Sequence, residues 1–193
     1  MIALAALVAG AAALVYAENE IGNSPLAAAD QMVTGATAAP GQAPKVLYDF
    51  NALPDPVKRM LEQIVVAAES GEIETMRPVL ESNELKPMVA AAHVEDPIEF
   101  WKRASADGAG RDVLAAMLNV IASGFVRVDQ GQNQMYVWPY FAETGLSGLS
   151  PSQEVELYRI VPPSLAVAMK RSGRYSYYRL GIAPNGVWHY FLQ

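Results

Sequence analysis

The stretch YSYYRLGIAPNGVWHYFL, residues 175–192, decides the fold. Its two ends, residues 175–182 and 187–192, are rich in aromatic and branched side chains, which is typical of strands. Between them lies Ala183-Pro184-Asn185-Gly186, which suits a tight turn because proline fits its second position and glycine accepts left-handed backbone. The pattern predicts a terminal hairpin with a three-residue loop and a glycine bulge.

The loop also predicts which side chains of this hairpin share a face. If Ala183 pairs with Val187, one face carries Tyr178, Leu180, Ile182, Trp188, Tyr190 and Leu192. The other face then carries Tyr175, Tyr177, Arg179, Gly181, Val187, His189 and Phe191. The first face suits a core, and the second is mixed in character.

A second hairpin is predicted over residues 125–129 and 134–141, and Pro139 marks its second strand as an edge or ends it, since proline donates no ladder hydrogen bond. Caps and apolar periodicity predict helices over residues 56–70, 72–81, 84–92, 97–103, 111–123, 151–161 and 164–169. The helix after the Ser150 capping box is expected to bury Val155, Tyr158 and Val161. The predicted fold class is α+β: N-terminal helices followed by two β-hairpins that form one antiparallel curved sheet, with helices between them.

The N-terminal part of the chain differs from the rest. Residues 2–17 are apolar throughout and end in Val15-Tyr16-Ala17, a pattern that signal peptidase accepts. We predict a signal peptide or N-terminal anchor over 1–17, although a basic n-region is missing. Residues 18–44 are rich in Ala, Gly, Pro, Thr and Ser, which predicts a disordered linker. Residues 45–193 then form a single α+β domain.

Composition limits the possible functions. The formal net charge is −6, and because no clustered Lys and Arg run is present, nucleic-acid binding is not expected. The chain has no cysteine, so an exported protein of this sequence is held by side-chain contacts without disulfides. The same absence excludes a thiol nucleophile and a cysteine metal site.

The mixed face of the last hairpin is the first candidate site. Tyr177, Arg179 and His189 share it, and Gly181 opposite His189 would leave open space above the sheet. Imidazole, phenol and guanidinium could act there as a base and an anion clamp. The alternative is the solvent-exposed side of a sheet, on which tyrosine and histidine are common.

Tyr136 and Trp138, together with Tyr140, alternate along one strand and form a second candidate. Such a row can stack on a ligand or a partner, or it can belong to the core. Lys170, Arg171, Arg174 and Arg179 are either an anion-attracting region or solvated charges near a helix end.

No other chemistry is indicated by the sequence. The segment His93-Val94-Glu95-Asp96 lacks a second histidine at ligand spacing, so no metal site is predicted. The sequence contains no nucleophile elbow and no phosphate-binding loop, so catalytic residues stay unknown and no cofactor is expected.

Three segments carry a resemblance: GIAPNGVWHYFL at the end, YVWPYFA at residues 136–142, and LSPSQEVELYRIV at residues 149–161. Over residues 96–193 the chain resembles a group of exported bacterial proteins of unknown function. The order of helices and then a sheet ending in a Gly-x-Trp-x-x-Phe strand is similar to nuclear-transport-factor-2-like folds. That resemblance implies a curved sheet around a pocket.

These features favour an exported cell-envelope protein, periplasmic or secreted, that acts as a non-enzymatic binding or interaction module. Its partner would be an envelope protein or a small ligand, with a possible N-terminal membrane tether. The alternative is a pocketed nuclear-transport-factor-2-like domain that binds or transforms a small anionic ligand.

Overall fold

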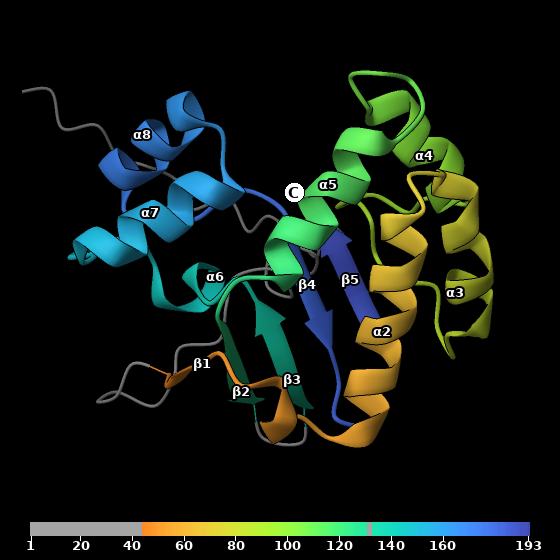
Figure 1. Cartoon of the computed structure of the whole chain (residues 1–193), viewed down its shortest axis with the longest axis horizontal. Coiled ribbons are helices and arrows are strands. Elements are labelled where there is room, and N and C mark those ends of the chain that lie inside the picture. Colours follow the sequence, from red (N-terminus) through yellow and green to blue (C-terminus); the bar gives the residue numbers. More distant parts are fainter. Residues whose placement is uncertain (1–43, 131–132) are drawn as a thin grey trace, which may run out of the picture. The chain divides into compact units, whose positions relative to one another are not determined.

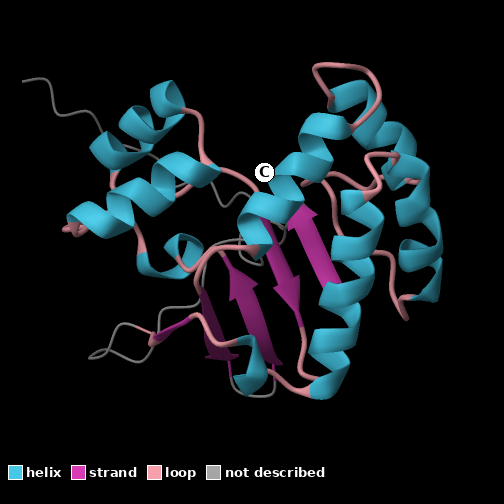
Figure 2. Cartoon of the chain, viewed as in Figure 1, coloured by secondary structure: helices cyan, strands magenta, loops and turns pink. Residues whose placement is uncertain are grey.

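The computed structural model describes residues 44–130 and 133–193, so the predicted signal or anchor over 1–17 and nearly all of the predicted linker lie outside the described residues. Seven α-helices and one five-stranded sheet occur in the described part (Figures 1 and 2). The strands are β1 Val46–Leu47, β2 Phe125–Gln130, β3 Asn133–Trp138, β4 Arg179–Ile182 and β5 Trp188–Leu192. The helices are α2 Asp55–Glu69, α3 Met76–Ser82, α4 Pro97–Ala104, α5 Arg111–Ile121, α6 Phe141–Thr144, α7 Pro151–Ile160 and α8 Pro163–Ser172. The α+β class is thus confirmed.

The sheet is antiparallel throughout, in the order β1-β2-β3-β4-β5. Its arrangement differs from the predicted one, in which helices come first and two hairpins make the whole sheet. A short strand, β1, precedes the helices and pairs with β2 through Val46–Val126 and Leu47–Phe125. Two residues carry too little alternation to be recognised as a strand from sequence.

The terminal hairpin has the predicted turn. The Ala183 N–H donates to the Val187 carbonyl at 2.9 Å, and Gly186 takes the positive φ of +90° that this loop requires. Ile182 pairs with Trp188 as expected, and Trp188 is fully buried.

Beyond that pair the predicted register is wrong. Gly181 pairs with Tyr190 and Leu180 with Phe191, because the strands shift by one residue at a bulge next to His189. An extra residue in one strand of a pair reverses the facing of every later side chain. Phe191 therefore joins Leu180 in the core, and Tyr190 lies on the opposite face.

One face of the sheet holds the aromatic core. Trp188 stacks on Trp101 of α4 with ring centres 6.3 Å apart, and Phe191 meets the same Trp101 edge-on. On β3, Trp138 stacks on Phe125 at 4.8 Å.

The helix α2 packs against α5, and α5 in turn reaches β4 (Figure 1). The apolar period predicts Val57, Met60, Leu61, Ile64, Val65 and Ala68 as the inward side chains of α2; all of them are buried except Val65, which is half-buried, and Ala67 is buried as well.

The segment after α3 consists of bends and irregular backbone with an isolated bridge between Met88 and Tyr190, and the helix predicted over residues 84–92 is wrong. The Asn83 side chain accepts from the Trp188 N–H at 2.9 Å and donates to the Trp188 carbonyl at 2.7 Å. Met88 continues the contact, since its N–H donates to the His189 carbonyl at 2.8 Å and its carbonyl accepts from the Phe191 N–H at 2.9 Å. Asparagine and Pro87 both disfavour a helix interior, and the outer edge of β5 supplies these backbone groups with other partners.

The helix α7 has the predicted capping box at Ser150, but it buries a different side. Its buried residues are Leu157 and Ile160, and Val161 at its C-cap is buried as predicted, whereas Val155 and Tyr158 are exposed. Among the residues that the structure describes, no helix has the length and apolarity needed to span a bilayer.

Candidate functional site

The three side chains predicted to converge on Gly181 do not find open space there. Tyr190, placed opposite Gly181 by the bulge, lays its ring over the glycine. A Cβ atom added to Gly181 would lie within contact distance of that ring and 2.6 Å from the Met135 sulfur. The absence of a side chain at Gly181 therefore accommodates Tyr190 and leaves no room for a ligand at that point.

Arg179 begins β4 and lies in an electrostatic group with Glu143, Tyr175 and Tyr190. Burial raises the pKa of the Glu143 carboxyl, and Arg179 opposes that rise. Burial raises the pKa of the Tyr190 hydroxyl far above its usual range, and the Glu143 charge adds to the rise. Sequence reasoning missed Glu143, because α6 brings it to β4 and β5 from far along the chain.

The other two predicted residues have different surroundings. Burial raises the pKa of the Tyr177 hydroxyl, and Asp112 adds to the rise. His189 is half-buried at the bulge, and burial lowers the pKa of its imidazole. Arg179 thus influences Tyr175 and Tyr190, while His189 is affected by desolvation.

The aromatic row on β3 is part of the core. Tyr136 is 7% exposed and Trp138 is fully buried, and both contact the ring of Phe125. A ligand could not stack on Trp138 without displacing Phe125.

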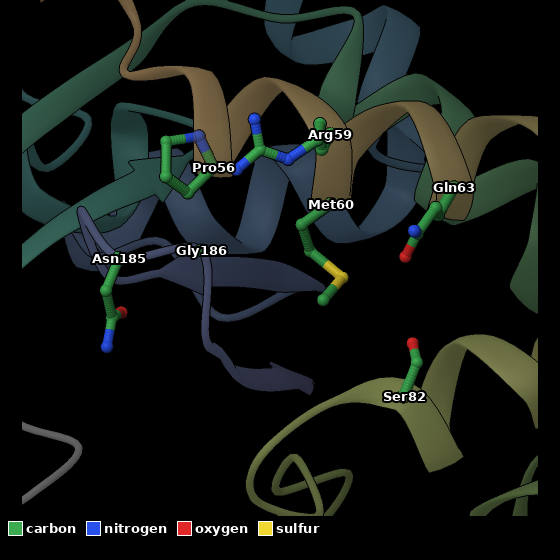
Figure 3. Close-up of a pocket in the computed structure, with 7 residues that line it drawn as sticks. All are labelled: Pro56, Arg59, Met60, Gln63, Ser82, Asn185 and Gly186. Atoms are coloured by element: carbon green, nitrogen blue, oxygen red, sulfur yellow. The ribbon is translucent and has the colours of Figure 1, made fainter.

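A hollow of about 200 Å³ lies where α2, the end of α3 and the β4–β5 turn meet (Figure 3). It is lined by Pro56, Arg59, Met60, Gln63, Ser82, Asn185 and Gly186, and we call it the α2–turn hollow. Figure 3 shows the Gln63 amide and the Ser82 hydroxyl pointing toward each other across it, with Met60 reaching down between α2 and the turn.

The walls of the α2–turn hollow are held by close contacts. A Cβ atom on Gly186 would lie 2.8 Å from the Pro56 carbonyl oxygen, so the turn packs directly on the first turn of α2. The Asn185 side chain accepts from the Val187 N–H at 3.2 Å, and the Ser82 hydroxyl donates to the Val79 carbonyl at 3.0 Å. These contacts hold the turn and the end of α3 in place around the hollow.

Arg59 is the cation of the α2–turn hollow. It is exposed and forms no ion pair with any described residue. A guanidinium with free donors binds carboxylates and phosphates through paired hydrogen bonds. Sequence reasoning missed this site: Arg59 and Gln63 are one helical turn apart, but nothing local indicates that Asn185 lies beside them.

The described residues contain no cluster of side chains that could bind a metal ion. Within residues 44–130 and 133–193, no group of three or more His, Asp or Glu side chains lies close enough to hold an ion. His93 is exposed, and its neighbour Asp96 caps α4 by accepting from the Ile98 and Glu99 N–H groups.

Comparison of the chain with protein-family models, with curated proteins and with solved structures finds no match.

Proposed function

We propose that residues 45–193 form the binding module of an exported cell-envelope protein, and that the α2–turn hollow takes an acidic group of its ligand. The observation that carries this proposal is Arg59, a guanidinium without an ionic partner among the described residues, which lines the same hollow as the polar side chains of Gln63, Ser82 and Asn185. The Ser82 hydroxyl already donates to the Val79 carbonyl, but the amide NH2 groups of Gln63 and Asn185 can donate to an anion together with the guanidinium.

The hollow is large enough to bind a small group but too small to enclose a large substrate. Its volume of about 200 Å³ is below the roughly 300–1,000 Å³ of pockets that hold drug-sized ligands. It suits a small dicarboxylate or the acidic side chain of a partner protein, with the apolar stem of that group against Met60. We therefore infer that its role is recognition of a small acidic group.

The test is a titration followed by the amide chemical shifts of the protein, with glutarate as the probe. We expect saturable shifts at Met60, Gln63 and Gly186, and their loss in Arg59→Gln. The matched control is Arg103→Gln, which removes an exposed arginine from α4. Equal shifts in both variants, or no saturable shift in the wild type, would contradict the proposal.

Export is a separate part of the proposal, and it is supported by the apolar residues 2–17. A mass measurement of the mature protein from the envelope fraction tests it. The proposed cleavage leaves Glu18 as the first residue, and a different N-terminus would refute that cleavage.

The alternative function, a nuclear-transport-factor-2-like domain with a pocket for a small anion, is favoured by one observation: Arg179 lies in an electrostatic group with Glu143 and Tyr190. In that case glutarate would shift the amides around Tyr190 and leave Met60 unchanged. If Arg179→Ala and His189→Ala both left binding unaltered, this alternative would be abandoned.

A further inference from the structure

The helices α7 and α8 expose apolar side chains on their outer sides. Val155 is 67% exposed, Tyr158 40% and Val167 49%, although the inward sides of both helices are buried. The Lys170 ammonium joins the two helices: it bonds to the Glu154 carboxylate at 2.7 Å and lies 5.8 Å from the centre of the Tyr158 ring. Val167 precedes Lys170 by one helical turn.

Positive charge surrounds these apolar side chains. Residues 151–179 hold five basic residues and two acidic ones, whereas the whole chain holds 14 basic and 20 acidic residues. Both acidic groups are engaged, Glu154 with Lys170 and Glu156 with the Gly124 N–H at 2.8 Å. Arg171 and Arg174 are exposed and form no ion pair with a described residue. We define the α7–α8 surface as Val155, Tyr158, Val167, Lys170, Arg171 and Arg174.

The residues after β1 contact α7. The first described residue is Pro44, which leads into β1, and the Tyr48 hydroxyl after β1 donates to the Glu156 carboxylate of α7 at 2.9 Å. In Figure 1, β1 is the edge strand at the left of the sheet, and α7 and α8 are drawn above that edge.

We propose that the α7–α8 surface docks on an anionic phospholipid membrane. Arg171 and Arg174 would lie at the headgroups, while Val155, Tyr158 and Val167 enter the interface, where tyrosine and aliphatic side chains are favoured next to basic residues. The inference rests on the envelope location in the proposed function and is independent of the α2–turn hollow. A membrane is favoured over an acidic partner protein because the basic side chains of this surface are interleaved with aliphatic and tyrosine side chains, which a bilayer interface accommodates.

A cysteine-free chain allows a direct test with single-cysteine variants of the full-length protein. Val167→Cys and, as control, Ala104→Cys at the exposed end of α4 are labelled with a polarity-sensitive fluorophore. The vesicles contain equal parts of phosphatidylglycerol and phosphatidylcholine, or phosphatidylcholine alone. We expect the label at 167 to shift to the blue and gain protection from an aqueous quencher only with phosphatidylglycerol, and the label at 104 to stay aqueous.

Charge variants of the labelled Val167→Cys protein measure the electrostatic contribution to membrane binding. Each basic residue near an anionic surface contributes roughly fivefold to partitioning, so Arg171→Glu with Arg174→Glu should weaken docking at least tenfold. Lys86→Glu with Arg103→Glu changes the net charge equally, at exposed positions outside the α7–α8 surface, and should have little effect.

Three outcomes would overturn the proposal. They are a label at 167 that stays aqueous on phosphatidylglycerol vesicles, an equal response to phosphatidylcholine alone, and an equal loss in both charge variants. Protection of position 167 by polyglutamate but not by vesicles would assign the surface to an acidic protein instead. The fluorophore at position 167 reports on this surface even if residues 2–17 bind the vesicle by themselves. The glutarate titration tests the α2–turn hollow, and its outcome does not depend on the vesicle experiment.

Discussion

Replacement of Asn83 by alanine should destabilise the domain by about 2–4 kcal/mol. Asn83 is only 9% exposed, and its amide serves both the N–H and the carbonyl of Trp188 at 2.9 and 2.7 Å. Alanine leaves both backbone groups without a partner at a buried strand edge, and each such group costs about 1–3 kcal/mol. Water that enters the space vacated by the amide would bond to these two backbone groups and so lower the upper end of the free-energy cost. The loss corresponds to a fall in melting temperature of roughly 5–15 °C for a domain of this size.

The assay for this prediction is denaturant unfolding at neutral pH, with Asn119→Ala on the exposed side of α5 as the matched control. The control should stay within about 0.5 kcal/mol of the wild type. Asn83→Asp gives a second measurement: it keeps the acceptor for the Trp188 N–H but loses the donor for the carbonyl. Its stability relative to the wild type should recover as acid protonates the carboxyl. If Asn83→Ala unfolded like the control, the Asn83 amide would not stabilise β5.

Three further changes test the terminal hairpin. Gly181→Ala should cost about 1–3 kcal/mol, because its Cβ meets the Tyr190 ring, and an unchanged unfolding midpoint would disprove that contact. Gly186→Ala should cost at least about 1 kcal/mol, since φ is +90° and Pro56 lies against the turn, and it should weaken glutarate binding; unchanged binding would contradict the hollow. Burial lowers the pKa of His189, so the unfolded chain takes up a proton first and wild-type stability should fall as pH drops below about 6.5. His189→Gln should flatten that part of the unfolding-versus-pH curve, and an identical slope would exclude His189 as its cause.

Local signals in the sequence predict most of the helices and turns. The cap at Asp96, the capping box at Ser150 and the turn through Gly186 are set by side chains within a few residues, and all three are present. The predictions are wrong where contacts between segments distant in the sequence determine the local structure. The bulge beside His189 exists together with the Met88 bridge and the Tyr190 ring over Gly181, and none of these follows from the periodicity of β5.

The candidate site was harder to predict than the fold for the same reason. A one-residue shift in β5 moves Tyr190 into the space expected above Gly181. Conversely, Arg59 and Asn185 become neighbours across the α2–turn hollow only because the terminal turn packs on the start of α2. No spacing rule links a helix to a turn so far along the chain.

The way β5 ends the sheet has a consequence for self-association. Exposed strand edges template further strands and so promote aggregation. Here Asn83 and Met88 already bond to the outward-facing backbone groups of Trp188, His189 and Phe191. A second molecule therefore finds no continuous row of unpaired amides along β5, and concentrated solutions should not assemble into fibres through this border of the sheet.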